Sequence, residues 1–122
     1  MRYHALIRTH HITSRKKVAV LKRAANTHQC AVLLRSGGCP GIMYVEGQDQ
    51  TQVESWVSAV RKLRYKDFQL VTRPGLLEPE ESDQGTDDLP SGLSEVESVK
   101  DFGSWMQRRR VWHWWRRGMG YS

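Results

Sequence analysis

Hydrophobic and polar positions alternate along residues 1–75 in a way that predicts four strands and two helices. The strands are expected at short runs of aliphatic, β-branched and aromatic residues that end at glycine, proline or polar residues. These runs are Tyr3 to Ile7, Cys30 to Leu34, Ile42 to Val45 and Phe68 to Thr72. The first run is compact and mainly apolar, which suits a strand with both faces at least partly covered. The dipeptide Pro74-Gly75 is expected to end the last strand.

Between these runs, apolar residues recur at spacings of three and four, which predicts two amphipathic helices. Thr13 or Ser14 is expected to cap the first helix, and Asp49 or Thr51 the second. The apolar stripes are Val18, Leu21, Ala24 and Ala25 in the first helix, and Val53, Trp56, Val57, Val60 and Leu63 in the second. The resulting order β-α-β-β-α-β predicts an α+β, ferredoxin-like fold with a split antiparallel sheet. Both helices would cover one face of that sheet and leave the other face to be covered.

The composition changes after residue 75. Residues 76–95 are rich in Glu, Asp, Ser, Gly and Pro, and we predict a flexible acidic linker because they bury too little apolar surface to offset their ordering entropy. Val99, Phe102 and Met106 then form a helical stripe, and four of the five tryptophans lie between residues 105 and 115. We expect residues 96–122 to be a C-terminal helical segment that packs back on the domain. Stacking of this Trp/Arg-rich tail on unpaired bases, or its insertion in a membrane interface, are the alternatives.

The net charge of +6 is unevenly distributed. Residues 1–75 hold 13 Lys and Arg against 4 Asp and Glu, residues 76–103 hold 1 against 9, and residues 104–122 hold 5 against none. No apolar run approaches the roughly 18 residues that a membrane span needs, and the N-terminus lacks the apolar stretch of a signal peptide. We therefore expect an intracellular protein, nuclear or cytoplasmic, without a membrane partner.

Positive charges gather where the helices are predicted to begin or end. Arg15, Lys16 and Lys17 stand at the start of the first helix, where each exposed positive charge opposes the helix dipole by about 0.3 to 1 kcal/mol. Folding does not require these charges, whereas phosphate binding would use them. The alternative is a solvated basic face that only keeps the protein soluble, or one that pairs with the acidic linker. The predicted nucleic-acid-binding residues are Arg15, Lys16, Lys17, Arg61, Lys62, Arg64, Lys66, Arg108, Arg109 and Arg110.

The residues that could support catalysis or metal binding lack a recognisable arrangement. The five histidines and two cysteines have no zinc-finger spacing. Cys39 lies in a glycine-rich turn, and a cysteine with a histidine is typical of a thiol nucleophile, but no orienting carboxylate can be assigned from the sequence. We therefore predict no catalytic residues, no metal, no cofactor and no small-molecule substrate.

Several short motifs resemble a known family. These motifs are His10-His11-Ile12, the run from Gly38-Cys39-Pro40-Gly41-Ile42 to Val45-Glu46-Gly47, Arg61-Lys62-Leu63 and Asp101-Phe102-Gly103. They resemble the C-terminal domain of pre-mRNA-processing factor 3, which also ends a group of RWD-domain-containing proteins. The resemblance covers roughly the whole chain and implies a ferredoxin-like domain, which in the spliceosomal member binds paired small nuclear RNAs. The chain departs from the family at Cys39, where relatives carry a basic residue, and the expected RWD domain is missing, as in a stand-alone version or a fragment.

Together these features predict a monomeric, non-catalytic RNA-binding domain whose basic surface contacts phosphates, as part of a splicing ribonucleoprotein. The alternative is a protein-protein interaction module that uses an apolar or Trp-bearing patch and has no nucleic-acid activity. The predicted partners are accordingly RNA or another protein.

Overall fold

The computed structural model describes residues 1–81 and 88–121, which form five strands and four helices. The strands are β1 (Tyr3–Thr9), β2 (Ala31–Arg35), β3 (Gly41–Gly47), β4 (Gln69–Leu76) and β5 (Gly92–Val96). The helices are α1 (Arg15–Thr27), α2 (Gln50–Lys62), α3 (Val99–Arg108) and α4 (Trp112–Met119). The first six elements follow the order β-α-β-β-α-β, which confirms the α+β, ferredoxin-like class with a C-terminal helical extension.

All five strands join one sheet in the order β4-β1-β3-β2-β5. The pairs β1–β3, β1–β4 and β2–β3 are antiparallel, as predicted. The fifth strand, which was not predicted, pairs in parallel with β2, from Gly92 opposite Ala31 to Val96 opposite Arg35, so the predicted antiparallel sheet becomes a mixed one. Residues 92–95 were predicted to be part of the linker. The strand β5 could not be recognised from the sequence, because a five-residue edge strand needs only two apolar side chains.

The strand β4 continues through Pro74 and Gly75 to Leu76, although this dipeptide was predicted to end it. The pairing with β1 shifts register between His4 and Leu6, beside Pro74. Proline has no N–H to donate, and it is tolerated here because β4 is an edge strand with an irregularity at that point.

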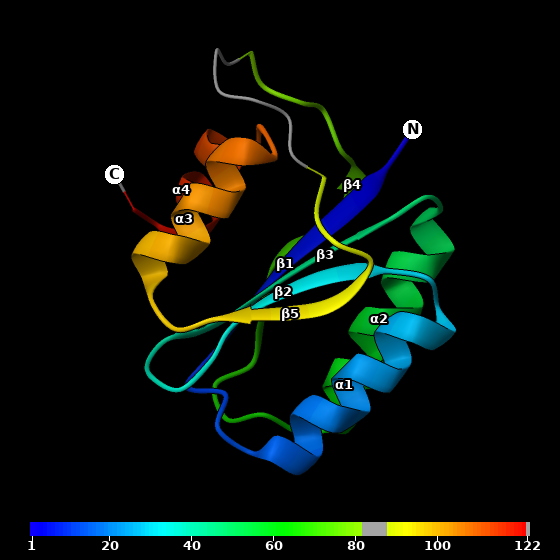
Figure 1. The fold of residues 1–122 in the computed structure, drawn as a ribbon, viewed down its shortest axis with the longest axis vertical. Helices are drawn as coiled ribbons and strands as arrows, with labels where there is room; N and C mark the ends of the chain where they lie inside the picture. The colour runs from blue at the N-terminus through cyan, green and yellow to red at the C-terminus, as the bar shows by residue number, and fades with distance from the viewer. Residues whose placement is uncertain (82–87, 122) are drawn as a thin grey trace.

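The sheet is covered on both faces, so the domain has three layers (Figure 1). On one face, α1 and α2 bury Val18, Leu21, Trp56 and Val60 against the sheet. On the other face, α3 and α4 bury Phe102, Met106, Trp115 and Met119 against Leu6, Leu33, Ile42 and Tyr44. The tryptophan-rich C-terminal segment thus packs back on the domain and supplies the cover that the second face of the sheet requires.

Part of the predicted acidic linker is anchored to the domain. Leu77 and Leu89 are buried in the core beneath α3 and α4. The carboxylate of Glu80 accepts hydrogen bonds from the backbone N–H groups of His113 (3.0 Å) and Trp114 (2.9 Å). A carboxylate is stabilising at a helix N-terminus, and Glu80 therefore caps α4, whose own N-cap residue Val111 has no polar side chain. The prediction of a flexible linker was wrong at these residues, and its central part, residues 82–87, lies outside the described chain.

Candidate nucleic-acid interface

The start of α1 and the end of α2 lie at the same end of the domain. The ammonium nitrogen of Lys17 lies 4.9 Å from the centre of the Tyr65 ring, which joins the first turn of α1 to the turn after α2. The guanidinium of Arg61 lies 4.9 Å from the centre of the Phe68 ring. The structure therefore brings together seven of the ten predicted residues, which we call the basic end. They are Arg15, Lys16, Lys17, Arg61, Lys62, Arg64 and Lys66.

The two helix ends differ in whether positive charge is favourable there. Ser14 caps α1, since its Oγ accepts a hydrogen bond from Lys17 N at 3.2 Å, and the first turn of the helix contains no acidic residue. The positive charges of Arg15 to Lys17 therefore oppose the dipole of α1. Arg61 and Lys62 lie in the last turn of α2, where positive charge is favourable, so their position needs no ligand to explain it.

The seven side chains differ in how free they are to contact a phosphate. Arg15 is already bound, because its guanidinium donates two hydrogen bonds, of 2.9 and 2.8 Å, to the carboxylate of Glu95 on β5. These hydrogen bonds, which Arg15 donates and Glu95 accepts, lower the pKa of Glu95 and raise the pKa of Arg15. Four other side chains of the basic end are exposed, namely Lys16, Lys62, Arg64 and Lys66. Within the described residues, none of these four takes part in an ion pair.

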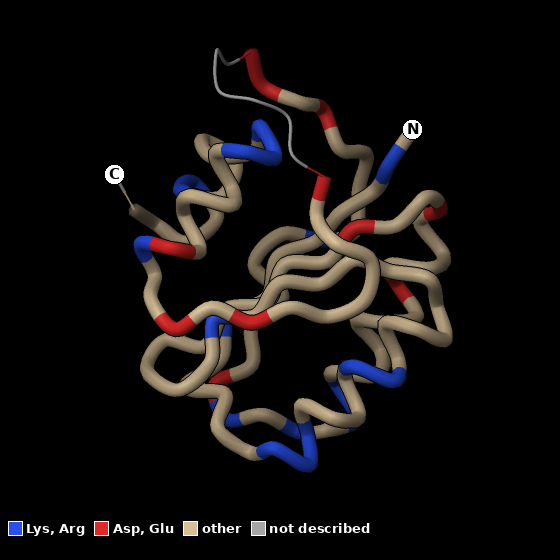
Figure 2. Tube along the Cα trace, in the orientation of Figure 1, with Lys and Arg blue, Asp and Glu red and all other residues tan. Residues whose placement is uncertain are grey.

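Arg108, Arg109 and Arg110 do not extend the basic end, and this part of the prediction was wrong. They follow one another at the end of α3, which lies on the other face of the sheet and at the opposite end of the molecule from the start of α1 (Figure 2). Arg109 is buried in an ion pair, and Arg110 donates a hydrogen bond from Nε to the carbonyl oxygen of Glu80. Arg108 rests on the Trp105 ring at 5.0 Å from its centre. A sequence pattern of three arginines could not show that the middle one points inward.

The ion pair of Arg109 belongs to a buried polar network on the second face of the sheet. Its guanidinium donates from Nε and Nη2 to the two carboxylate oxygens of Glu46, both at 2.7 Å. Tyr44 donates its hydroxyl to Glu46 at 2.9 Å, so the Tyr44 oxygen must accept the 3.0 Å hydrogen bond from Nδ1–H of His4. Trp114 of α4 stacks on the His4 ring with centres 3.9 Å apart.

Burial changes the titration of these groups. Burial, aided by the charge of Arg109, lowers the pKa of His4 from 6.5 to about 4 and keeps the imidazole neutral. Burial and the Glu46 carboxylate raise the pKa of Tyr44 well above its ordinary value. Burial opposes the charge of Arg109, but its hydrogen bonds with Glu46 outweigh this effect and leave the pKa of Arg109 raised. Every member of the network has a hydrogen-bonding partner, so it is structural and leaves nothing for a nucleic acid to bind.

A second group of polar side chains lies beside the basic end, where an open cavity of about 560 Å³ is lined by Arg8, Thr9, His10, Cys39, Pro40, Asp67, Phe68 and Gln69. Cys39 Sγ is 3.7 Å from His10 Nε2, and His10 Nδ1 is 3.6 Å from Asp67 Oδ2. Asp67 is the carboxylate that could not be assigned from the sequence. The predicted topology contained a signal for it, since His10 follows the first strand and Asp67 precedes the fourth, and these strands are antiparallel neighbours in a ferredoxin-like sheet.

These three side chains do not form a metal site. Asp67 contacts the Nδ1 side of the imidazole and Cys39 the Nε2 side, so a single ion could not bind both. No cluster of His, Cys, Asp and Glu in residues 1–81 and 88–121 is placed to hold a metal ion. None of the helices in these same residues combines the length and apolar character that crossing a membrane requires.

The chain matches no family model, no curated protein and no solved structure. The resemblance to the C-terminal domain of pre-mRNA-processing factor 3 therefore stays a prediction from the sequence motifs. The function has to be argued from the surface of this domain itself.

Proposed function

We propose that this domain binds RNA without base specificity, through phosphate contacts made by the basic end. The observation that carries the proposal is the pair of positive charges in the first turn of α1, the exposed Lys16 and the half-buried Lys17, where they oppose the helix dipole. The neighbouring Lys62, Arg64 and Lys66 widen the same surface. Such a cluster neutralises phosphates and releases counterions, which is the main source of affinity in sequence-independent binding.

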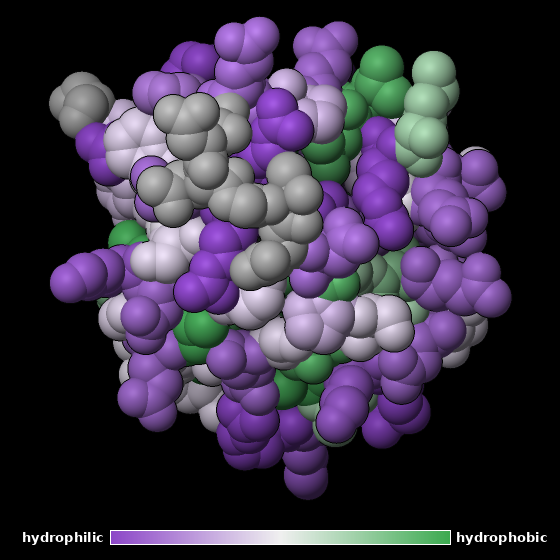
Figure 3. All heavy atoms as spheres, turned by 45° about the horizontal axis from the view of Figure 1, so that its top comes forward, coloured by the Kyte–Doolittle hydropathy of each residue, from purple (hydrophilic) through white to green (hydrophobic). Residues whose placement is uncertain are grey.

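Two further observations support this proposal over a protein-interaction surface. The tryptophan-rich segment is occupied in covering the sheet, because Trp115 is buried and Trp114 stacks on His4. On the face drawn in Figure 3, hydrophilic side chains predominate and the hydrophobic ones form small separate patches. By resemblance, the role would be that of an intracellular protein in a splicing ribonucleoprotein of the nucleus.

The test is a titration of a fluorescent RNA stem-loop at two salt concentrations, followed by anisotropy. We expect the affinity of the wild-type domain to fall steeply as salt rises. In the variant Lys16→Ala/Lys62→Ala/Lys66→Ala, the slope of log K against log salt should shrink by about one for each phosphate contact that is lost. Lys100→Ala, an exposed lysine at the start of α3, is the matched control and should leave the slope unchanged.

Absence of binding at low salt, or an equal loss in the Lys100 variant, would contradict RNA binding by the basic end. The protein-interaction alternative would then rest on a groove of about 430 Å³ beside α3 and α4, which Trp112, Trp115 and Tyr121 help to line. The indole N–H of Trp115 is buried without a hydrogen-bond partner among the described residues, so a ligand in this groove could not reach it.

A further inference from the structure

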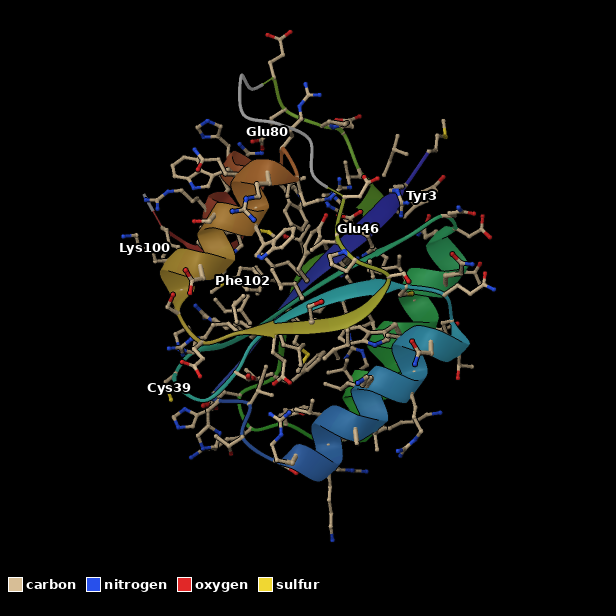
Figure 4. The ribbon with its side chains drawn as sticks, in the orientation of Figure 1. Tyr3, Cys39, Glu46, Glu80, Lys100 and Phe102 are labelled. Carbon is tan, nitrogen blue, oxygen red and sulfur yellow. The ribbon has the colours of Figure 1, made fainter. Side chains whose placement is uncertain are left out.

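The loops at one end of the sheet hold a thiol, an imidazole and a carboxylate in sequence. Cys39 comes from the loop between β2 and β3, His10 directly follows β1, and Asp67 precedes β4. Figure 4 shows Cys39 at the end of the sheet away from Glu46, so this group is separate from the buried network. Three segments that are distant in the sequence therefore converge on one cavity.

The backbone of His10 holds these loops together. Its N–H donates to the carbonyl oxygen of Lys66 at 2.9 Å, beside Asp67, and its carbonyl oxygen accepts from Gly41 N at 3.2 Å, beside Cys39. Gly41 has no room for a side chain, because an added Cβ would collide with the side chains of Thr9 and Ile12. The relative positions of the three functional groups are therefore set by main-chain contacts and not by the side chains alone.

We propose that Cys39 is a nucleophile that accepts an acyl group from an activated ester or thioester, with His10 as its general base and Asp67 as a positioning residue. The order thiol, imidazole, carboxylate is the order that activates a cysteine in acyl-transfer sites. The 3.7 Å from Cys39 Sγ to His10 Nε2 is within hydrogen-bond distance for sulfur, whereas the 3.6 Å from His10 Nδ1 to Asp67 Oδ2 is longer than a formed hydrogen bond, and such contacts commonly tighten only when substrate binds. The side chains have room to do so, since His10 is 43% and Asp67 66% exposed.

The reaction follows from which atoms face each other. Once the contact with Asp67 tightens, Oδ2 accepts from Nδ1–H of His10, which leaves the Nε2 lone pair directed at the thiol. Nε2 takes the proton of Cys39 as Sγ forms a bond to the acyl carbon, and it returns that proton to the leaving alkoxide or thiolate as the original bond breaks. The product is a thioester on Cys39. Attack of water on this thioester, again with His10 taking the proton and passing it to Sγ, releases the carboxylic acid and restores the thiol.

The surroundings suit a small acyl group. Pro40 and Phe68 give the cavity apolar walls, and Arg8, held by a 2.6 Å hydrogen bond to Gln69, gives it a positive side. Within the described chain, no group accepts a hydrogen bond from the Cys39 N–H, which is therefore available to the oxygen of the reacting carbonyl. This inference does not depend on RNA binding, and either can fail without the other.

The experiment is acetylation of the intact protein by 4-nitrophenyl acetate, measured by nitrophenolate release and by the mass of the protein, with the modified residue located by peptide mapping. We expect one acetyl group on Cys39, loss of the reaction in Cys39→Ala, and acylation about 100-fold slower in His10→Gln. Cys30→Ala and His11→Gln are the matched controls and should react like the wild type. Cys30 is buried, and burial raises its pKa to about 11.

The role of Asp67 has its own readout. Asp67→Asn keeps a side chain that tolerates the left-handed backbone at this position, where φ is 55°. A positioning carboxylate predicts a change in the shape of the pH–rate profile, whereas a residue that only shapes the loop would lower the rate equally at every pH. The proposal is overturned if Cys39 reacts no faster than free N-acetylcysteine at the same pH, or if His10→Gln reacts like His11→Gln.

Discussion

At the scale of single residues, the buried ion pair of Glu46 and Arg109 is where the loss of one partner should destabilise the fold most. Both side chains are buried. In place of water, the Glu46 carboxylate accepts two hydrogen bonds from the Arg109 guanidinium and one from the Tyr44 hydroxyl. Arg109→Met would leave a buried carboxylate without its counter-charge, and we expect it to lower the free energy of unfolding by about 3 to 5 kcal/mol. Urea unfolding followed by tryptophan fluorescence measures this loss.

Two variants separate this effect from others. Arg108→Met, on the exposed side of the same helix, should change stability by less than about 0.5 kcal/mol. The double variant Glu46→Gln/Arg109→Met should be more stable than Arg109→Met alone, because the uncompensated charge is gone. If the double variant loses the sum of both single effects, the ion pair is not the source of the loss.

The imidazole of His4 makes stability depend on pH in a defined window. Its pKa is about 4 in the folded protein and 6.5 ordinarily, so between these values the unfolded chain binds the extra proton. Stability should therefore be complete above about pH 6.5 and decline as the pH falls toward 4, by on the order of 3 kcal/mol from this group. Unfolding free energies of the wild type and His4→Phe across this range measure it, and equal pH dependence in the two proteins would refute it.

At the scale of elements, the approach of α4 to the sheet is set by Gly118. A Cβ at this position would lie 2.9 Å from Leu6 Cδ2 and 3.1 Å from Thr72 Oγ1. We expect Gly118→Val to push α4 away from β1 and β4, to cost about 1 to 3 kcal/mol and to shift tryptophan emission to longer wavelength. Gly120→Asn, at the left-handed residue after α4, is the control and should change the emission little. Unaltered emission and stability in Gly118→Val would mean that the contact is not tight.

The elements also show where prediction from the sequence succeeds and where it stops. Runs and stripes such as Ile42 to Val45 and Val53 to Val60 predict strands and helices because each element must bury one face. The strand β5 escapes this logic, since it is stabilised by backbone pairing with β2 and not by its own pattern. Two features of the sites depend on tertiary contacts that no local spacing encodes. These are the burial of Arg109 against Glu46 and the contact of His10 with Asp67.

At the scale of the whole molecule, the two ends of the sheet have different properties. Beside Glu46, α3, α4 and the segment of Glu80 cover the second face of the sheet (Figure 4). The opposite end carries the exposed cations of the basic end and the cavity of Cys39, and it remains accessible. Both proposed activities therefore use the end of the sheet that holds the loops of His10, Cys39 and Asp67.

The margins of the sheet decide how a partner can attach. At one margin, β4 contains Pro74 and an irregular register, and at the other, β5 is five residues long and begins at Gly92 with φ of 83°. Neither offers the long, regular row of main-chain groups on which an added strand assembles. Neither a foreign peptide nor another copy of the chain is therefore expected to add a strand to this sheet. A partner would have to be recognised through side chains.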